Sequence, residues 1–182
     1  ATVSACASGS NAIIDSYNYI MSGTADIIVT GGSESAVNET GVGGFNALKA
    51  LSERNESPET ASRPFDRDRD GFVLGEGGGA LILEEYNHAK KRDAKIYGEI
   101  IGFGMSCDAH HITAPHPQGE GAKLVMENAL DNAKIKIEDV DHINVHGTST
   151  PLGDKSEIMA IENVFGDITC LLYTSPSPRD GR

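Results

Sequence analysis

The stretch "ATVSACASGSNAIIDSYNYI", residues 1–20, places one cysteine between a short β-type run and a helical pattern. Residues 2–5 predict the end of a strand, and residues 11–21 predict a helix. Small neighbours let the chain turn sharply at Cys6, and a helix that begins there points free N–H groups and its positive dipole end at the sulfur. That environment favours the nucleophilic thiolate. A buried structural cysteine is the alternative that this stretch leaves open.

An alternation of strands and helices continues along the rest of the chain. Strands are expected at residues 26–30, 80–83, 96–105 and 143–145, and helices at residues 42–51, 84–92, 121–133 and 153–165. Alternating elements of these lengths predict an α/β protein with a largely parallel sheet. Residues 52–72 predict a long polar loop, and loops of this length in compact domains are usually functional or mobile.

Composition limits the possible functions. The chain has 182 residues, 38% of them apolar, which suits one globular domain or part of a larger one. Its net charge of −12 argues against a nucleic-acid partner, and no apolar run is long enough for a membrane span. Three widely spaced cysteines argue against a disulfide framework and a zinc ribbon, which indicates a reducing, cytoplasmic compartment. No signal peptide opens the chain, and because residue 1 is Ala rather than Met, we expect the true N-terminus to lie upstream.

A second motif, "INVHGTSTPLGDKSE" at residues 143–157, carries a histidine at the end of an apolar strand. Open α/β sheets bind their ligands at such strand ends. Hydroxyl side chains follow His146 at residues 148–150, and Asp154 stands near the start of the next helix. A histidine in this place is as compatible with a structural role as with catalysis, and only the fold can bring it close to Cys6.

Three further signals carry less chemistry. "GEGGGA" at residues 75–80 fits G-x-G-x-x-A, but a strand follows it rather than a helix, so close backbone packing explains it better than a dinucleotide site. "DAHHITAPHP" places three histidines near Asp108, yet their spacing puts no i, i+4 pair on a helix, so we expect no metal. Cys107, at the end of a predicted apolar strand, is expected to be inert core.

Three motifs together resemble a β-ketoacyl-acyl carrier protein synthase of the elongating type. They are "SACASGSNAI" (4–13), "GFVLGEGGGALILEEYNHAKKR" (71–92) and "NVHGTSTPLGDKSE" (144–157). The chain is most similar to the condensing enzyme of bacterial fatty-acid synthase II, over residues 1–167 without a visible gap. Modular polyketide synthase domains typically show "TACSSSL" and "HGTGT", so "SACASGS" and "HGTST" favour the fatty-acid branch.

The resemblance implies a thiolase-like fold, in which two βαβαβ halves pack as a five-layered αβαβα sandwich. Residues 1–94 would be the later part of the N-terminal half and residues 95–167 the first part of the C-terminal half, so the fold would be incomplete at both ends. Residues 168–182, "ITCLLYTSPSPRDGR", lack helical and strand periodicity, and we expect a non-native tail translated from vector or adapter sequence. A disordered native tail is the alternative.

The same resemblance implies roles for individual residues. Cys6 matches the nucleophile that accepts the acyl chain as a thioester. His146 matches the first of two histidines, which assists decarboxylation of the malonyl group and stabilises the enolate oxygen. The other matched positions are Thr148, Thr150 and Thr113 along the pantetheine arm, Phe45 in the acyl pocket, Asp154 and Glu157 as acidic supports of the active site, and Lys49 on the carrier-docking face, where an ordinary solvated lysine is the alternative.

The implied reaction is the decarboxylative Claisen condensation of fatty-acid elongation, carried out by a homodimer. Its partners are acyl carrier protein and the malonyl and acyl thioesters, and it needs no metal and no cofactor beyond the phosphopantetheine of the carrier.

The family's second histidine, its upstream lysine and the glycine-rich gating segment do not occur in residues 1–182, so the chain alone is expected to be inactive and poorly soluble. The alternatives are a non-catalytic chain-length partner subunit, a starter-unit synthase and a polyketide-type ketosynthase. Cys6 argues against the first, and "HGTSTPLGD" against the second.

Overall fold

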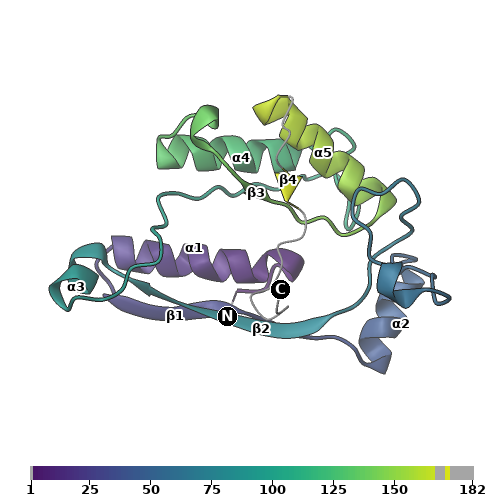
Figure 1. Cartoon of the computed structure of the whole chain (residues 1–182), viewed down its shortest axis with the longest axis horizontal. Helices are drawn as coiled ribbons and strands as arrows, with labels where there is room; N and C mark the ends of the chain where they lie inside the picture. Colours follow the sequence, from purple (N-terminus) through teal and green to yellow (C-terminus); the bar gives the residue numbers. More distant parts are fainter. Residues whose placement is uncertain (1, 167–170, 173–182) are drawn as a thin grey trace. The chain divides into compact units, whose positions relative to one another are not determined.

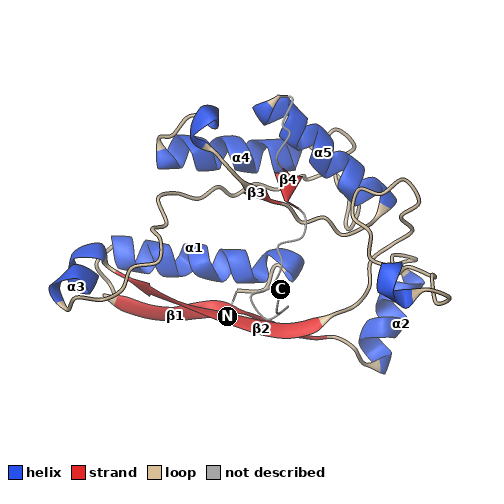
Figure 2. Ribbon diagram, viewed as in Figure 1, coloured by secondary structure: helices blue, strands red, loops and turns tan. Residues whose placement is uncertain are grey.

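The computed structural model of the chain describes residues 2–166 and 171–172 (Figures 1 and 2). Its helices are α1 (Ser8–Met21), α2 (Glu39–Ala47), α3 (Tyr86–Lys91), α4 (Glu120–Ala133) and α5 (Pro151–Phe165), and its strands are β1 (Ile27–Ser35), β2 (Glu76–Glu84), β3 (Ile143–Asn144) and β4 (Leu171–Leu172). Short 3₁₀ turns cover Ala5–Ala7, Pro58–Thr60 and Ile137–Asp139. None of the described helices is long and apolar enough to cross a membrane.

The chain divides into two compact units. Unit 1 contains Ala1–Val42 and Leu74–Ile101, and unit 2 contains Gly43–Val73 and Gly102–Arg182. The long polar loop that precedes β2 therefore belongs with the C-terminal part of the chain. The expected division into family halves at residue 94 stays a prediction, because these units reflect contacts within the chain rather than family halves.

Unit 1 is a two-stranded antiparallel sheet with α1 lying along one face (Figure 1). Alternate residues of β1 point to opposite faces, so Thr30 is buried while Val29 is 71% exposed. Val29 pairs with Ile82 of β2, which is 69% exposed, on the face that α1 does not cover. The apolar run thus forms a strand whose two faces have different environments.

Glycines let the backbones of unit 1 approach closely. A Cβ added to Gly32 in β1 would lie 3.2 Å from the Cα of Gly9 in α1, so helix and strand meet backbone to backbone. A Cβ added to Gly31 would lie 2.0 Å from the carbonyl oxygen of Gly79 in β2. The "GEGGGA" run therefore enters β2 and packs against β1, which confirms the expected strand.

Unit 2 contains the second half of α2, α4, α5, the β3–β4 pair and the long loop. α4 and α5 pack against each other, and Ala160 and Ile161 of α5 are only 0% and 2% exposed. Pro151 occupies the first turn of α5, where its missing N–H costs no helical hydrogen bond. β3 runs parallel to β4, with Ile143 opposite Leu171.

The long periodic helices are confirmed, with shifted boundaries. α1, α4 and α5 begin at residues 8, 120 and 151, slightly before the expected starts at 11, 121 and 153. In α5 the shift has a local cause, because the Thr150 side chain accepts a hydrogen bond from the N–H of Gly153 and so caps the helix. α2 lies earlier than expected, at Glu39–Ala47 instead of residues 42–51.

Two predicted strands are wrong, and so is the predominance of parallel pairing. Residues 2–5 lead into a 3₁₀ turn, and residues 96–105 form no strand within the described part of the chain. A β-forming run becomes a strand only when a neighbour satisfies its N–H and C=O groups, and no described strand pairs with these runs. The longer pair, β1–β2, is antiparallel. The expected non-native tail, residues 168–182, lies outside the described residues except for β4.

Candidate active site

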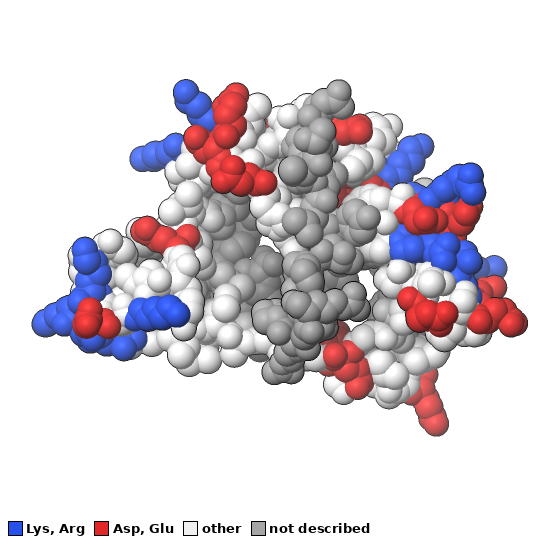
Figure 3. All heavy atoms as spheres, viewed as in Figure 1, with Lys and Arg blue, Asp and Glu red and all other residues white. Residues whose placement is uncertain are grey.

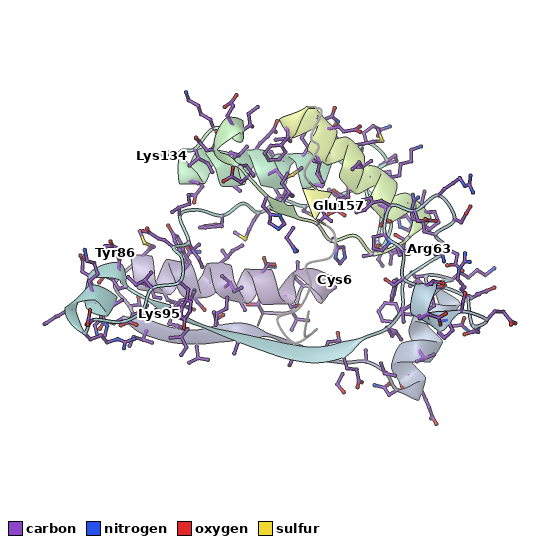
Figure 4. The ribbon with its side chains drawn as sticks, in the orientation of Figure 1. Cys6, Arg63, Tyr86, Lys95, Lys134 and Glu157 are labelled. Carbon is purple, nitrogen blue, oxygen red and sulfur yellow. The ribbon has the colours of Figure 1, made fainter. Side chains whose placement is uncertain are left out.

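Cys6 lies in a strained turn directly before α1, in unit 1 (Figure 4). The preceding residue, Ala5, has φ of 51°, a left-handed conformation that costs a non-glycine residue energy. The Ser8 hydroxyl braces the turn, because it accepts from the Ser4 N–H at 2.9 Å and donates to the Ala5 carbonyl at 2.7 Å. Asn11 donates to the Ser4 hydroxyl at 2.6 Å. The turn leaves the Cys6 side chain exposed, as an attacking thiol requires.

His146 lies in a second strained turn, which connects β3 to α5 in unit 2. Gly147 and Ser149 have φ of 51° and 67°. The Glu157 carboxylate of α5 accepts from the backbone N–H groups of His146 at 2.7 Å and Gly147 at 2.8 Å. Left-handed turns form such concave sets of N–H groups, which bind anions. The His146 residue itself is exposed.

Asp154, in the first turn of α5, holds the same turn through hydrogen bonds and is only 1% exposed. Its Oδ1 accepts from the N–H of Ser149 at 3.0 Å, and its Oδ2 accepts from the N–H of Phe65 at 2.7 Å. The Arg69 guanidinium completes the set, with Nε 3.2 Å from Oδ2. A buried carboxylate is stable only when charge and hydrogen bonds compensate its lost hydration, and these three partners do so.

Two hydroxyl groups stand beside the histidine turn. The Thr148 and Thr150 Oγ1 atoms are 2.9 Å apart and share a hydrogen bond. Thr150 also caps α5 by accepting from the Gly153 N–H at 3.2 Å. The capping bond fixes the orientation of the Thr150 side chain, and with it the position of the hydroxyl pair.

The remaining predicted residues lie on other segments of unit 2. Phe45 of α2 is 38% exposed and contacts Phe72 edge to face, with ring centroids 5.1 Å apart. Lys49 is exposed just after α2, in a left-handed conformation with φ of 54°. Thr113 is exposed, and its N–H donates to the His111 ring at 3.1 Å. The structure therefore gathers Thr148, Thr150, Asp154 and Glu157 around His146, while Cys6 belongs to unit 1.

The histidine-rich segment is organised by hydrogen bonds rather than by a ligand cluster. Asp108 accepts from the backbone N–H of His116 at 2.8 Å, and the rings of His110 and His116 meet edge to face at 5.1 Å. Within the described residues, no group of three or more His, Cys, Asp or Glu side chains is arranged to hold a metal ion. Cys107 is exposed, so its prediction as core is wrong, because the segment around it joins no described sheet that could cover it.

Sequence reasoning missed Arg69, and it named Ser149 only as one of the hydroxyls after His146, not as a buried support of the turn. Ser149 is completely buried, and its Oγ accepts from the backbone N–H of Arg63, the loop residue labelled in Figure 4. Arg69 lies in the polar loop and pairs with a carboxylate in α5. The alternating acidic and basic residues of "DRDRD" at 66–70 are the one visible signal, and such alternation usually indicates a solvated surface.

Charged side chains are distributed unevenly (Figure 3). Lys and Arg gather over α3, and both signs mix over the long loop. Beside α3, Glu84 at the end of β2 is held by Arg92 at 2.7 and 2.5 Å and by the His88 ring of α3 at 2.6 Å. The hydrogen bonds from Arg92 first, and from His88 second, lower the pKa of Glu84 from 4.5 to about 2. This cluster stabilises the end of β2 and contacts none of the predicted site residues.

Comparison with known proteins gives two family matches. "Beta-ketoacyl synthase, N-terminal domain" matches residues 1–89, and "Beta-ketoacyl synthase, C-terminal domain" matches residues 97–177. The chain is 52% identical over 168 residues to the mitochondrial 3-oxoacyl-[acyl-carrier-protein] synthase of Arabidopsis thaliana, covering 92% of this chain and 36% of the relative. It is 49% identical over 167 residues to 3-oxoacyl-[acyl-carrier-protein] synthase 2 of Staphylococcus aureus, covering 92% of this chain and 41% of the relative.

A solved structure agrees with these matches. It contains a type II polyketide synthase acyl-carrier protein in complex with its ketosynthase bound to the hexaketide. The match has a TM-score of 0.86 at 40% identity, and covers 89% of this chain and 40% of that chain.

The structure therefore has the thiolase-like α/β fold of the ketosynthases that it matches. The chain belongs to the beta-ketoacyl synthase family. It spans 36% and 41% of the length of the two relatives.

Proposed function

We propose that the protein containing this chain is a 3-oxoacyl-[acyl-carrier-protein] synthase that extends acyl chains in fatty-acid synthesis. The observation that carries the proposal is the exposed Cys6 in the braced turn before α1. Both relatives, at 49% and 52% identity, are named as synthases of this kind. Membership of the family supplies the chemistry that such a nucleophile would perform.

The reaction has two transfers. The Cys6 thiol gives up its proton and the thiolate attacks the carbonyl carbon of the acyl thioester; the carrier's pantetheine sulfur leaves as a thiolate and takes up a proton in turn. The C–C bond to the malonyl carboxylate then breaks, carbon dioxide leaves, and the electron pair forms an enolate on the malonyl thioester. The enolate carbon attacks the acyl group on Cys6, and the Cys6 sulfur leaves. The His146 ring donates a hydrogen bond to the enolate oxygen as charge develops there.

The other predicted residues bind and orient the substrates. The hydroxyls of Thr148 and Thr150 would hydrogen-bond the pantetheine arm, with Thr113 as a further contact, and Phe45 would line the acyl pocket. Asp154 and Glu157 act indirectly, because their carboxylates hold the turn that carries His146. Lys49 is exposed and would attract the acidic surface of a carrier protein.

The proposal includes acyl carrier protein as the partner, a role that a carrier protein has for the polyketide ketosynthase described above. It also includes a homodimer and a cytoplasmic location, with no metal and no cofactor of the enzyme's own. The thioester and the loss of carbon dioxide supply the activation that a metal or strong base would otherwise provide.

A chain-length partner subunit is the main alternative. Such a subunit would bind the carrier without forming an acyl-enzyme, so the exposed Cys6 favours the catalytic reading. The sequence identity of 52% and 49% to two proteins named as 3-oxoacyl-[acyl-carrier-protein] synthases favours fatty-acid elongation over a polyketide-type ketosynthase. The expectation that the 182-residue chain alone is inactive also stays part of the proposal.

The test uses the full-length protein encoded by the source gene. Incubation with a carrier protein that is loaded with an acyl group should increase the mass of the synthase by one acyl group. The substitution Cys6→Ala should abolish both this adduct and condensation. Substitution Cys107→Ala, at the other exposed cysteine of the described residues, is the matched control and should change neither. Condensation that continues with Cys6→Ala would overturn the proposal.

A further inference from the structure

The polar loop that precedes β2 wraps the histidine turn. Backbone N–H groups donate from Arg63 to Ser149 Oγ at 3.1 Å and from Gly71 to the Ser149 carbonyl at 3.0 Å. The N–H of Phe65 donates to Asp154 at 2.7 Å. We call residues 63–71 the cradle. Its N–H groups satisfy buried acceptors far away in the sequence, with separations of 86 and 89 residues in two of these bonds.

Arg69 supplies the cradle's charged contact with the turn. Its Nε faces Asp154 Oδ2 at 3.2 Å and donates to the Thr150 carbonyl at 3.1 Å. Its Nη2 donates to the Pro151 carbonyl at 2.8 Å. The planar guanidinium directs its N–H groups at fixed angles, so these contacts define the position of the first turn of α5. The side chain is 17% exposed, so water competes little for these groups.

Strain makes this support necessary. Ser149, a non-glycine residue, has φ of 67°, and such conformations persist only where the surroundings impose them. The Glu157 carboxylate fixes His146 to α5, but it does not hold the first turn of α5 against the cradle. The contacts of Arg69 with Thr150, Pro151 and Asp154 do so.

We propose that Arg69 is a positioning residue, which acts through Asp154 and the first turn of α5 to place His146 for decarboxylation. The inference rests on the proposed function, because it assigns Arg69 to one of the two transfers. Acylation uses Cys6, whose braced turn lies wholly in unit 1. Loss of Arg69 should therefore impair the decarboxylation step and spare acylation.

The experiment compares Arg69→Gln and Arg69→Lys with Arg67→Gln and Arg67→Lys in the full-length protein. Arg67 lies in the same loop, but its side chain is 90% exposed and pairs with the adjacent Asp68. Two rates are measured on folded protein: acyl transfer onto Cys6 by intact mass, and carbon dioxide release from malonyl-carrier protein. For release, kcat and KM are determined separately.

Arg69→Gln should lower kcat for carbon dioxide release about 10- to 100-fold, because a shift of about 1 Å in a catalytic group can cost about 100-fold, with KM little changed. Acylation of Cys6 should stay within about twofold, an amount well below the effect of a misplaced catalytic group. For Arg69→Lys, kcat for carbon dioxide release should fall between those of Arg69→Gln and wild type. Lysine keeps the positive charge but lacks the planar guanidinium that donates in several fixed directions. Both Arg67 variants should match wild type.

Three results would overturn the inference. Equal losses in the rates of Cys6 acylation and carbon dioxide release would show that Arg69 has a purely structural role. An unchanged rate of carbon dioxide release in folded Arg69→Gln would show that Arg69 does not position His146. If Arg69→Gln does not fold, Arg69→Lys provides the test. A rate of carbon dioxide release equal to that of wild type in Arg69→Lys would then overturn the positioning role of Arg69. Failure of the wild-type protein to acylate Cys6 at all would instead reject the proposed function.

Discussion

Oε1 of Glu157 accepts a hydrogen bond from the backbone N–H of His146 at 2.7 Å. The other oxygen, Oε2, accepts from the next N–H, that of Gly147, at 2.8 Å. The left-handed conformation of Gly147 turns the two N–H groups toward one carboxylate. A side chain on α5 thereby fixes the backbone of the residue proposed to stabilise the enolate.

Glu157→Gln should lower the free energy of unfolding by about 1–3 kcal/mol, because the new amide nitrogen leaves one of the two N–H groups without an acceptor. Urea unfolding of the full-length protein measures the change. Glu162→Gln, at an exposed position of the same helix, is the matched control. Equal stability of the two variants would show that Glu157 does not hold the turn.

The strained residue before Cys6 gives a second prediction. Ala5→Gly should leave stability unchanged or raise it by up to about 1 kcal/mol, because glycine adopts φ of 51° without the penalty that alanine carries. Ala12→Gly is the comparison, since Ala12 lies inside α1, where glycine relieves no strain and weakens the helix. It should lose about 0.5–1 kcal/mol. The prediction fails if denaturant unfolding shows the same loss for both variants.

Gly31 is the position in β1 where a side chain should be least tolerated. An added Cβ would lie 2.0 Å from the Gly79 carbonyl oxygen, and the φ of 154° is one that side chains rarely adopt. We expect Gly31→Ala to lower the free energy of unfolding by about 1–3 kcal/mol, the usual range for overpacking. Gly77→Ala, with no atom within 4 Å of the added Cβ, should cost less. Thermal unfolding of the two variants side by side makes the comparison.

The Glu84 cluster predicts a pH dependence of stability. Because Arg92 and then His88 lower the Glu84 pKa from 4.5 to about 2, the unfolded state takes up a proton at higher pH than the folded state. The cluster's contribution to stability is therefore complete above about pH 5, falls as the pH drops from about 4.5 to about 2, and is absent below that. The difference in unfolding free energy between wild type and Glu84→Gln should shrink over this window.

Glu99→Gln, at an exposed carboxylate of the same unit, is the control for that titration. A Glu84→Gln difference that stays constant across the window would mean that the ion pairs do not couple to folding.

Local pattern was enough to predict α1, α4 and α5, because helical hydrogen bonds join residues four apart and apolar spacing records the buried face. It was not enough for residues 96–105, because a strand depends on a partner that its own residues do not specify. The antiparallel direction of β1 and β2 was missed for the same reason. An apolar run of four or five residues has the same pattern in either direction.

The site shows the same division. The motifs mark the positions of Cys6 and His146, and the turn expected before α1 is present with its strain at Ala5. Arg69 was missed, because an arginine within "DRDRD" has the composition of a solvated loop. Its role depends on acceptors 81 and 82 residues further along the chain.

By itself the sequence determined the family, the order of most helices and the residues that carry reactive groups, since these are properties of residue type and local spacing. Only the tertiary structure decided which groups surround Asp154. That carboxylate is 1% exposed and must find compensation for its lost hydration. Arg69 and the N–H of Phe65, which is 89 residues away, provide this compensation, because folding brings the long loop against the first turn of α5.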